Sequence, residues 1–249
     1  MKLKLIQKVN EAKDTKTFFW ETEKPVSWLP GQYFYFTLPK LSQPDPRGST
    51  RHFTISSSPT EGQNIRLTTR IRDHSGYKQT LDRLSIGSII EGEGPNGTYI
   101  LDEKESGTHI LIAGGIGITP FRSFIKYNID KKLTKISIHL IYANSTPSEI
   151  TFRKELEAWD KKYDNIKVDF TISRPEESKR NLPAGRQEWQ SLTGRIDENL
   201  IRKLTTNYSL PTTTFWLCGP PPMVEAVEKV LGSMKITSDK LRAEKFTGY

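Results

Sequence analysis

Apolar and polar side chains alternate along the first hundred residues with the period of β-strands. "GQYFYFTL" (31–38) is rich in aromatic and β-branched residues, and in "NIRLTTRIR" (64–72) every second position is apolar or a threonine. Turn-forming stretches such as "PDPRGS" and "GPNGT" separate these runs, and "YKQTLDRL" (77–84) has the pattern of a short amphipathic helix. Residues 1–104 are therefore predicted to form an antiparallel β-barrel or sandwich, of which we favour the barrel.

The pattern changes near residue 105, where apolar strands begin to alternate with amphipathic helices. Strands are expected at 109–114, 135–143, 166–173 and 213–219, and helices at 119–129, 149–163, 197–206 and 221–232. The polar stretch "RPEESKRNLPAGRQEWQSLTG" (174–194) is predicted to be the longest loop. This alternation predicts a second domain, residues 105–249, built as an α/β doubly wound parallel sheet.

Composition narrows the class of protein. The 249 residues include 37 Lys and Arg against 29 Asp and Glu, giving a net charge of +8, and no apolar run is long enough to span a bilayer. The start "MKLKLIQKVNEAKD" lacks a signal peptide's apolar core, so a cytoplasmic protein without stable membrane insertion is expected. The basic residues are dispersed and no nucleic-acid-binding motif is found, while an acidic protein partner fits the charge. One cysteine, Cys218, excludes an internal disulfide and a cysteine-only metal or iron–sulfur site.

Two turns follow predicted parallel strands, at the edge of the sheet where such folds bind ligands. In "GGIGITP" (114–120), glycines are followed by Thr119 and Pro120, which we interpret as the N-cap and first residue of a helix. Free backbone N–H groups and a helix start suit a pyrophosphate, although a plain tight turn is the alternative. In "CGPPPM" (218–223), Cys218 is either a small buried residue or a group beside a ligand.

The first half carries its own candidate binding residues. In "RHFTISSSP" (51–59), Arg51 could hold a phosphate, Phe53 could lie against a flat ring, and the Thr54 hydroxyl could bond a ring nitrogen. An ordinary strand with a solvated arginine is the alternative. "SGYKQTL" (75–81) provides Gly76 and a helix start that could cradle a second phosphate.

Eight motifs in order resemble the ferredoxin–NADP reductase superfamily over essentially the whole chain: "PGQY", "RHFTISSSP", "SGYKQTL", "EGPNGTY", "LIAGGIGITPF", "LIYANS", "CGPPPM" and "AEKFTGY". The resemblance implies an FAD-binding barrel (1–104) and an NAD(P)-binding domain (105–249), with hydride passing between nicotinamide and flavin. It further implies electron transfer to a separate one-electron carrier such as ferredoxin or flavodoxin. A reductase component of an oxygenase, a flavin or ferric reductase, and a flavin-binding regulatory module without turnover remain alternatives.

The resemblance also assigns flavin-binding roles. Arg51 would bind an FAD phosphate, Phe53, in place of the family's tyrosine, would pack on the isoalloxazine, and Thr54 would bond near flavin N5. Residues of the 76–80 turn would hold the FAD pyrophosphate, namely Gly76, Gln79 and Thr80, and the exact side-chain donor stays open between Gln79 and Thr80.

For the nucleotide, the resemblance places Cys218 near nicotinamide C4 and Glu244 near the flavin edge, with either Phe246 or Tyr249 covering the ring. The NAD(P) pyrophosphate and neighbouring contacts fall to the residues of the two turns: Gly114, Gly115, Gly117, Thr119, Gly219 and Met223. The ribose 2′-phosphate would bind Ser173 and Arg174, with Arg195 from the long loop and Lys179 and Arg180 as weaker candidates. NADPH is therefore expected in preference to NADH, which remains possible; Glu176 and Glu177 weaken the local field.

Overall fold

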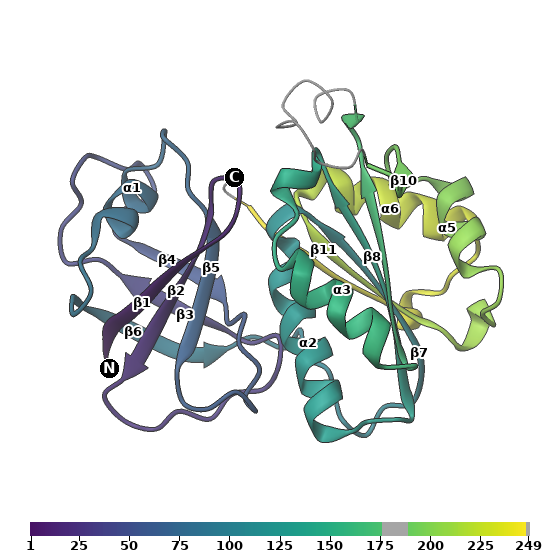
Figure 1. The fold of residues 1–249 in the computed structure, drawn as a ribbon, viewed down its shortest axis with the longest axis horizontal. Coiled ribbons are helices and arrows are strands. Elements are labelled where there is room, and N and C mark those ends of the chain that lie inside the picture. The colour runs from purple at the N-terminus through teal and green to yellow at the C-terminus, as the bar shows by residue number, and fades with distance from the viewer. Residues whose placement is uncertain (176–188, 248–249) are drawn as a thin grey trace. The chain divides into compact units, whose positions relative to one another are not determined.

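The computed structural model describes residues 1–175 and 189–247, and the chain divides into two compact units (Figure 1). The first consists of Met1–Asp102 together with Thr119–Lys131, and the second of Glu103–Ile118 together with Lys132–Tyr249. The helix that follows the glycine turn at 114–117 thus belongs to the first unit, although the turn itself belongs to the second.

The first unit is a six-stranded antiparallel sheet in the order β4-β3-β6-β1-β2-β5. An antiparallel bridge between Ile55 and Leu67 joins its two edges and closes it as a barrel. The predicted antiparallel fold is confirmed. Its strands are β1 (Lys2–Ala12), β2 (Thr15–Thr22), β3 (Tyr33–Thr37), β4 (Thr50–Thr54), β5 (Ile65–Arg70) and β6 (Ile89–Asn96), and its short helix is α1 (Gly76–Arg83).

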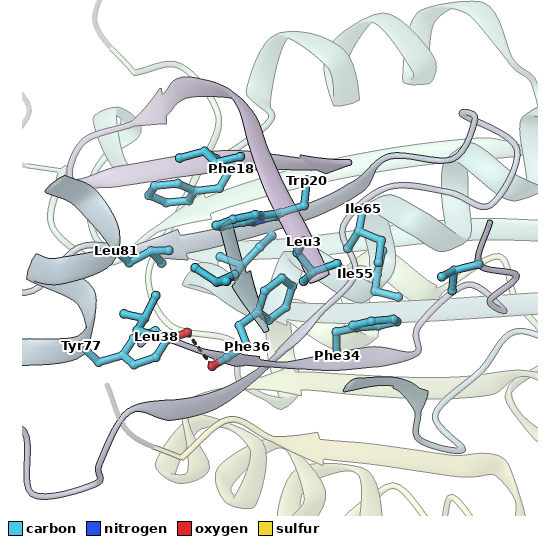
Figure 2. Packing of buried hydrophobic residues seen from close by; sticks show 14 of the residues in the cluster. Leu3, Phe18, Trp20, Phe34, Phe36, Leu38, Ile55, Ile65, Tyr77 and Leu81 are labelled. Carbon is cyan, nitrogen blue, oxygen red and sulfur yellow. Dashed lines mark hydrogen bonds between the residues drawn. The ribbon is translucent and has the colours of Figure 1, made fainter. Parts of the chain in front are cut away.

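Aromatic residues fill the barrel, as Figure 2 shows. Trp20 and Phe36 lie 6.0 Å apart between ring centroids, and both are fully buried. The Tyr77 hydroxyl donates to the Phe36 carbonyl over 2.9 Å, which fastens α1 to β3. Alternation alone does not describe β5, because Thr68 on its polar face is also buried, with its hydroxyl bonded to that of Thr17 at 2.8 Å.

Helix α2 (Ile118–Lys131) is attached to the first unit by a buried ion pair. The Arg122 guanidinium, 2% exposed, donates to both carboxylate oxygens of Glu61 at 2.7 and 3.0 Å and to the Ser56 carbonyl at 2.7 Å. Ser123 adds a hydrogen bond to the Ser57 carbonyl. Burial alone would raise the pKa of Glu61, but the hydrogen bonds and charge of Arg122 outweigh it and hold that pKa below its ordinary value.

The second unit is a six-stranded parallel sheet in the order β10-β9-β8-β7-β11-β12. Crossovers in both directions from β7 make it doubly wound, as predicted. Side chains of α5 and α6 cover one face with residues such as Ile201 and Val227, and α3 crosses the other (Figure 1). The elements are β7 (Gly107–Gly114), β8 (Ile136–Asn144), β9 (Ile166–Ile172), β10 (Leu192–Thr193), β11 (Thr214–Gly219), β12 (Leu241–Lys245), α3 (Arg153–Lys162), α5 (Glu198–Thr205) and α6 (Pro221–Ser233).

Three local predictions are wrong. Thr119 does not cap α2: a 3₁₀ turn at Gly115–Gly117 runs directly into the helix, so Pro120 lies in the first turn, where its missing N–H costs no hydrogen bond. Helix α3 begins at Arg153 rather than near residue 149, because Phe152 adopts a left-handed conformation (φ 60°). Part of the predicted long loop forms β10, which pairs with β9.

Across the described ranges 1–175 and 189–247, no helix has both the length and the apolar character needed to cross a bilayer.

We expect Glu61→Gln to lower the free energy of unfolding by about 3 kcal/mol, because Arg122 would keep its charge in a buried position without a carboxylate. Urea unfolding followed by tryptophan fluorescence measures the loss. The matched control is Glu157→Gln, which breaks an exposed pair with Arg153 on α3 and should cost about 0.5 kcal/mol or less. Equal losses in the two variants would contradict a dominant role for the buried pair.

Candidate functional site

Strand β4 presents Arg51 and Phe53 on one face and Thr54 on the other, since side chains alternate along a strand. The Phe53 ring lies at the margin of the barrel core, with its centroid 6.0 Å from that of Phe36 and 5.9 Å from that of Tyr77. It is half-buried, so one part of the ring packs on protein while the rest stays accessible. This is the arrangement that a residue stacking on a flat ligand requires.

Thr54 differs from the hydroxyl residues that follow it. The hydroxyls of Ser56, Ser57 and Ser58 all bond to neighbouring groups of the barrel. Within the described residues, the Thr54 hydroxyl makes no hydrogen bond, although the residue is only 5% exposed. Of these four, Thr54 is therefore the one with a hydroxyl left for a ligand.

The Arg51 guanidinium is held beside the start of α1 by Asp45, a residue that sequence reasoning treated only as part of a turn. One carboxylate oxygen of Asp45 pairs with Arg51 at 2.5 Å and accepts from the Arg47 backbone N–H at 3.0 Å. The other accepts from the Ser75 hydroxyl at 2.9 Å and from the Tyr77 backbone N–H at 3.0 Å. Burial raises the pKa of Asp45, but these hydrogen bonds prevail and lower it to about 2. In this structure, Arg51, the Ser75 hydroxyl and the backbone N–H groups of Arg47 and Tyr77 therefore bind an anion, the Asp45 carboxylate.

The residues predicted to bind the FAD pyrophosphate lie together on α1, but in this structure they contact neighbouring protein segments. A side chain at Gly76 would collide with the backbone carbonyls of Gln43 and Pro44. Thr80 donates to the Gly76 carbonyl at 2.7 Å and accepts from the Ser42 N–H at 2.8 Å. The Gln79 amide donates to the Arg72 carbonyl at 3.3 Å.

Positive charge is concentrated around the same helix. Lys78 is 7% exposed, and burial together with neighbouring charges lowers its pKa to about 8. The charges come from four arginines: Arg72, Arg47, Arg70 and Arg51. Such a field favours a ligand that carries more than one negative charge.

In the second unit, the ends of β7 and β11 approach each other too closely for side chains. A side chain at Gly117 would collide with the backbone of Cys218 and Gly219, and one at Gly219 would lie 3.1 Å from the backbone of Gly114. At Gly114 it would collide with Met223. Gly115 differs, because its φ of +53° favours glycine and the space beside its Cα is open.

The predicted turn residues are thus gathered in the second unit, apart from Thr119, which is buried in the first turn of α2. Gly117 is required by its contact with the backbone at the end of β11, whereas at Gly114 the Met223 side chain fills the space that a Cβ would need. The open side of Gly115 is where a phosphate could approach the backbone.

Cys218 and Glu244 are paired across β11 and β12, next to this turn. Cys218 is fully buried, and burial raises the pKa of its thiol well above the ordinary value, as does the nearby Glu244. Burial also raises the pKa of Glu244 to about 7, and its Oε2 has no hydrogen-bond partner in the described part of the chain. Phe246 follows β12, and its N–H donates to the Gly219 carbonyl at 2.9 Å. Tyr249, the other candidate cover, lies outside the described residues.

The predicted 2′-phosphate residues lie at the carboxyl end of β9. Backbone N–H groups of Ser173 and Arg174 bond to the carbonyls of Asn144 and Ser145 at 3.0 and 2.9 Å, and both side chains are exposed. Arg195 is also exposed, and it follows Gly194, whose N–H bonds to the Ile172 carbonyl at 2.8 Å. The structure therefore brings Arg195 to the same strand end as Arg174.

The weaker candidates Lys179 and Arg180, with Glu176 and Glu177, lie outside the described residues.

Comparison with known proteins covers both units. Residues 2–117 match the family model "Oxidoreductase FAD-binding domain", and residues 111–229 match "Oxidoreductase NAD-binding domain". The chain is 27% identical over 224 residues to the anthranilate 1,2-dioxygenase electron transfer component of Acinetobacter baylyi, covering 90% of this chain and 59% of that protein. It is 29% identical over 191 residues to NADH-cytochrome b5 reductase 1 of Lodderomyces elongisporus, covering 76% and 60%.

Among solved structures, the cytochrome b5 reductase domain of Ulva prolifera nitrate reductase matches with a TM-score of 0.79 and 25% identity, covering 98% of this chain and 96% of that one. The chain spans about three fifths of the length of the curated relatives named above. The two family models together extend over residues 2–229. The chain is therefore a member of the ferredoxin–NADP reductase superfamily of FAD- and pyridine-nucleotide-binding oxidoreductases.

Proposed function

We propose that this chain binds FAD on its barrel, binds NAD(P)H on its parallel sheet, and passes the electrons to a separate one-electron carrier protein such as ferredoxin or flavodoxin. The observation that carries the proposal is the close approach of β7 and β11, which leaves open space at Gly115 beside the start of a helix. Backbone N–H groups at such a turn suit a dinucleotide pyrophosphate.

The barrel residues fit FAD. The donors that now hold the Asp45 carboxylate, including Arg51, Ser75 and the Tyr77 N–H, would bind its phosphates. The accessible part of Phe53 would pack on the flat ring, and the Thr54 hydroxyl would bond a ring nitrogen. Bound FAD supplies the conversion between two-electron hydride chemistry and one-electron transfer.

The residues beside the nucleotide turn would position the nicotinamide and flavin rings rather than react with them covalently. The Cys218 thiol stays protonated because of its burial, so it would pack beside the nicotinamide without acting as a nucleophile. Glu244 would hold a proton on its carboxyl group up to a pH of about 7. Phe246, bonded to the end of β11 through its N–H, would cover the flavin ring.

The electron acceptor is proposed to lie outside these 249 residues, because their one cysteine is too few to bind a cysteine-ligated cluster. The net charge of +8 favours encounter with an acidic carrier. A second candidate function, reductase component of an oxygenase, is favoured by the relative that is named as a dioxygenase electron transfer component.

Anaerobic mixing tests the proposal. Cofactor extracted from the purified protein should be FAD, NADPH or NADH should bleach its absorbance, and ferredoxin or flavodoxin should restore it. A protein that holds FMN or no flavin after reconstitution, or FAD that neither nucleotide bleaches, would contradict the proposed function.

The raised pKa of Glu244 predicts that the stability of the folded chain depends on pH. Its pKa is about 7 in the folded chain against an ordinary 4.5, so between these values the folded state binds more protons than the unfolded state. Stability should therefore fall as pH rises from 4.5 to about 7, by about 2 kcal/mol, and Glu244→Gln should remove that fall. Urea unfolding at several pH values measures it, with Glu225→Gln on exposed α6 as the control. A difference between Glu244→Gln and the unmutated protein that is constant with pH would contradict the assignment.

Arg174 predicts coenzyme preference. A carboxylate after the third strand suits NADH, whereas the Ser173–Arg174 pair suits the 2′-phosphate of NADPH. We expect kcat/KM to be at least about tenfold higher with NADPH, and Arg174→Ala to reduce it much more with NADPH than with NADH. Steady-state kinetics with both coenzymes measure this, and Arg202→Ala on α5 is the control for loss of an exposed arginine. Equal efficiencies in the unmutated protein would remove the support for NADPH.

A further inference from the structure

We propose that Asp45 is an internal anion that occupies the phosphate-binding position at the start of α1, and that FAD binds only after the segment Ser42–Arg47 moves away. The inference rests on the proposed FAD function, which it deepens: Asp45 would control how tightly and how fast the flavin is taken up.

Asp45 uses the hydrogen-bond donors that a phosphate would need. Its carboxylate takes the Arg51 guanidinium, the Ser75 hydroxyl and the Tyr77 N–H, all between 2.5 and 3.0 Å. Arginine, a hydroxyl and a helix N-terminal N–H together form a receptor for oxyanions. A carboxylate and a phosphate cannot share these donors, because both are negative and each needs the same hydrogen bonds.

The backbone just before Asp45 lies against the start of α1. The carbonyls of Gln43 and Pro44 lie where a Gly76 side chain would be, so the segment covers the first turn of α1. Ser42 bonds to Thr80 through both its N–H and its hydroxyl, at 2.8 and 3.0 Å. The absence of a side chain at Gly76 accommodates this segment in the present structure and would expose the helix backbone once the segment left.

Asp45 differs from its neighbours in the segment by having a buried side chain. Ser42, Gln43, Pro44, Pro46 and Arg47 are exposed, whereas the Asp45 side chain is only 5% exposed. The segment therefore buries little apolar surface and is held mainly by polar contacts. Such contacts can be exchanged for those of a ligand at small net cost, because another anion satisfies the same donors.

The surrounding charge favours exchange for a more highly charged anion. Four arginines lie close enough to Lys78 to lower its pKa, and Asp45 supplies one negative charge among them. A pyrophosphate supplies two, so it would neutralise more of this charge. FAD should then displace the carboxylate, although with an apparent affinity reduced by the fraction of molecules in which the segment is closed.

The test compares FAD binding to flavin-depleted full-length proteins by flavin fluorescence. Asp45→Asn, which weakens the closed state, should bind FAD at least about fivefold more tightly and with a faster association rate. The melting temperature should respond more strongly to FAD than in the unmutated protein, because less of the binding free energy is spent on opening the segment. The matched control is Asp73→Asn, an exposed carboxylate that bonds Gln79 rather than Arg51 and changes the net charge equally. It should alter FAD affinity less than twofold.

A second variant tests the motion itself. In Ser42→Cys combined with Thr80→Cys, the new thiols would replace hydroxyl oxygens that lie 3.0 Å apart, and oxidation would lock the segment on α1. The oxidised form should take up FAD at least tenfold more slowly than the same protein after reduction. This comparison needs no wild-type reference, and the native Cys218 is fully buried.

The possible outcomes distinguish the role of Asp45 from FAD binding itself. Equal or weaker FAD binding by Asp45→Asn, an equal gain in Asp73→Asn, or equal uptake by the oxidised and reduced double variant would overturn the role of Asp45 while leaving FAD binding intact. If the unmutated protein binds no FAD, the proposed function fails, and this inference fails with it.

Discussion

The parallel pairing of β7 with β11 leaves no space for side chains where the two strands end, and the nucleotide turn depends on this contact. A Cβ at Gly117 would collide with the Cys218 backbone, one at Gly114 would collide with the Met223 side chain, and one at Gly219 would lie only 3.1 Å from the Gly114 backbone. The same contact places Cys218 at the strand end, where β12 brings Glu244 opposite it. Larger residues at these glycines would separate the strands and displace both groups.

Two buried ion pairs in the first unit have different structural meanings. The Arg122–Glu61 pair has a bidentate geometry and joins α2 to the segment after β4. The Arg51–Asp45 pair joins β4 to an exposed loop at a helix N-terminus. A buried arginine without its carboxylate is costly in either place, and each carboxylate also accepts from a backbone N–H, that of Ser58 at Glu61 and that of Tyr77 at Asp45. The donors around Asp45 differ because they lie at a helix N-terminus and include the Ser75 hydroxyl, a combination that another oxyanion could use.

Burial rather than charge sets the protonation of the groups beside the nucleotide turn. Cys218 and Glu244 both have raised pKa values, so near neutral pH the thiol is uncharged and the Glu244 carboxyl is only partly ionised. Around α1, burial together with the charges of four arginines lowers the pKa of Lys78, and the arginines keep these surroundings cationic. A neutral, close-packed environment suits a ring, and a cationic one suits phosphates.

The sequence by itself determined that an antiparallel sheet is followed by a parallel one, because strand and helix periods report which faces are buried. It also determined the family, because eight motifs follow in order. The assignment of residues 119–131 to the first unit came only from the tertiary structure. The partnership of Arg122 with Glu61 could not be predicted, since these residues are 61 positions apart and meet only through packing. Nor could the role of Asp45, which has the local signature of a turn and gains its buried contacts from β4 and α1. Local pattern encodes burial, whereas the choice of polar partners is made when distant elements come together.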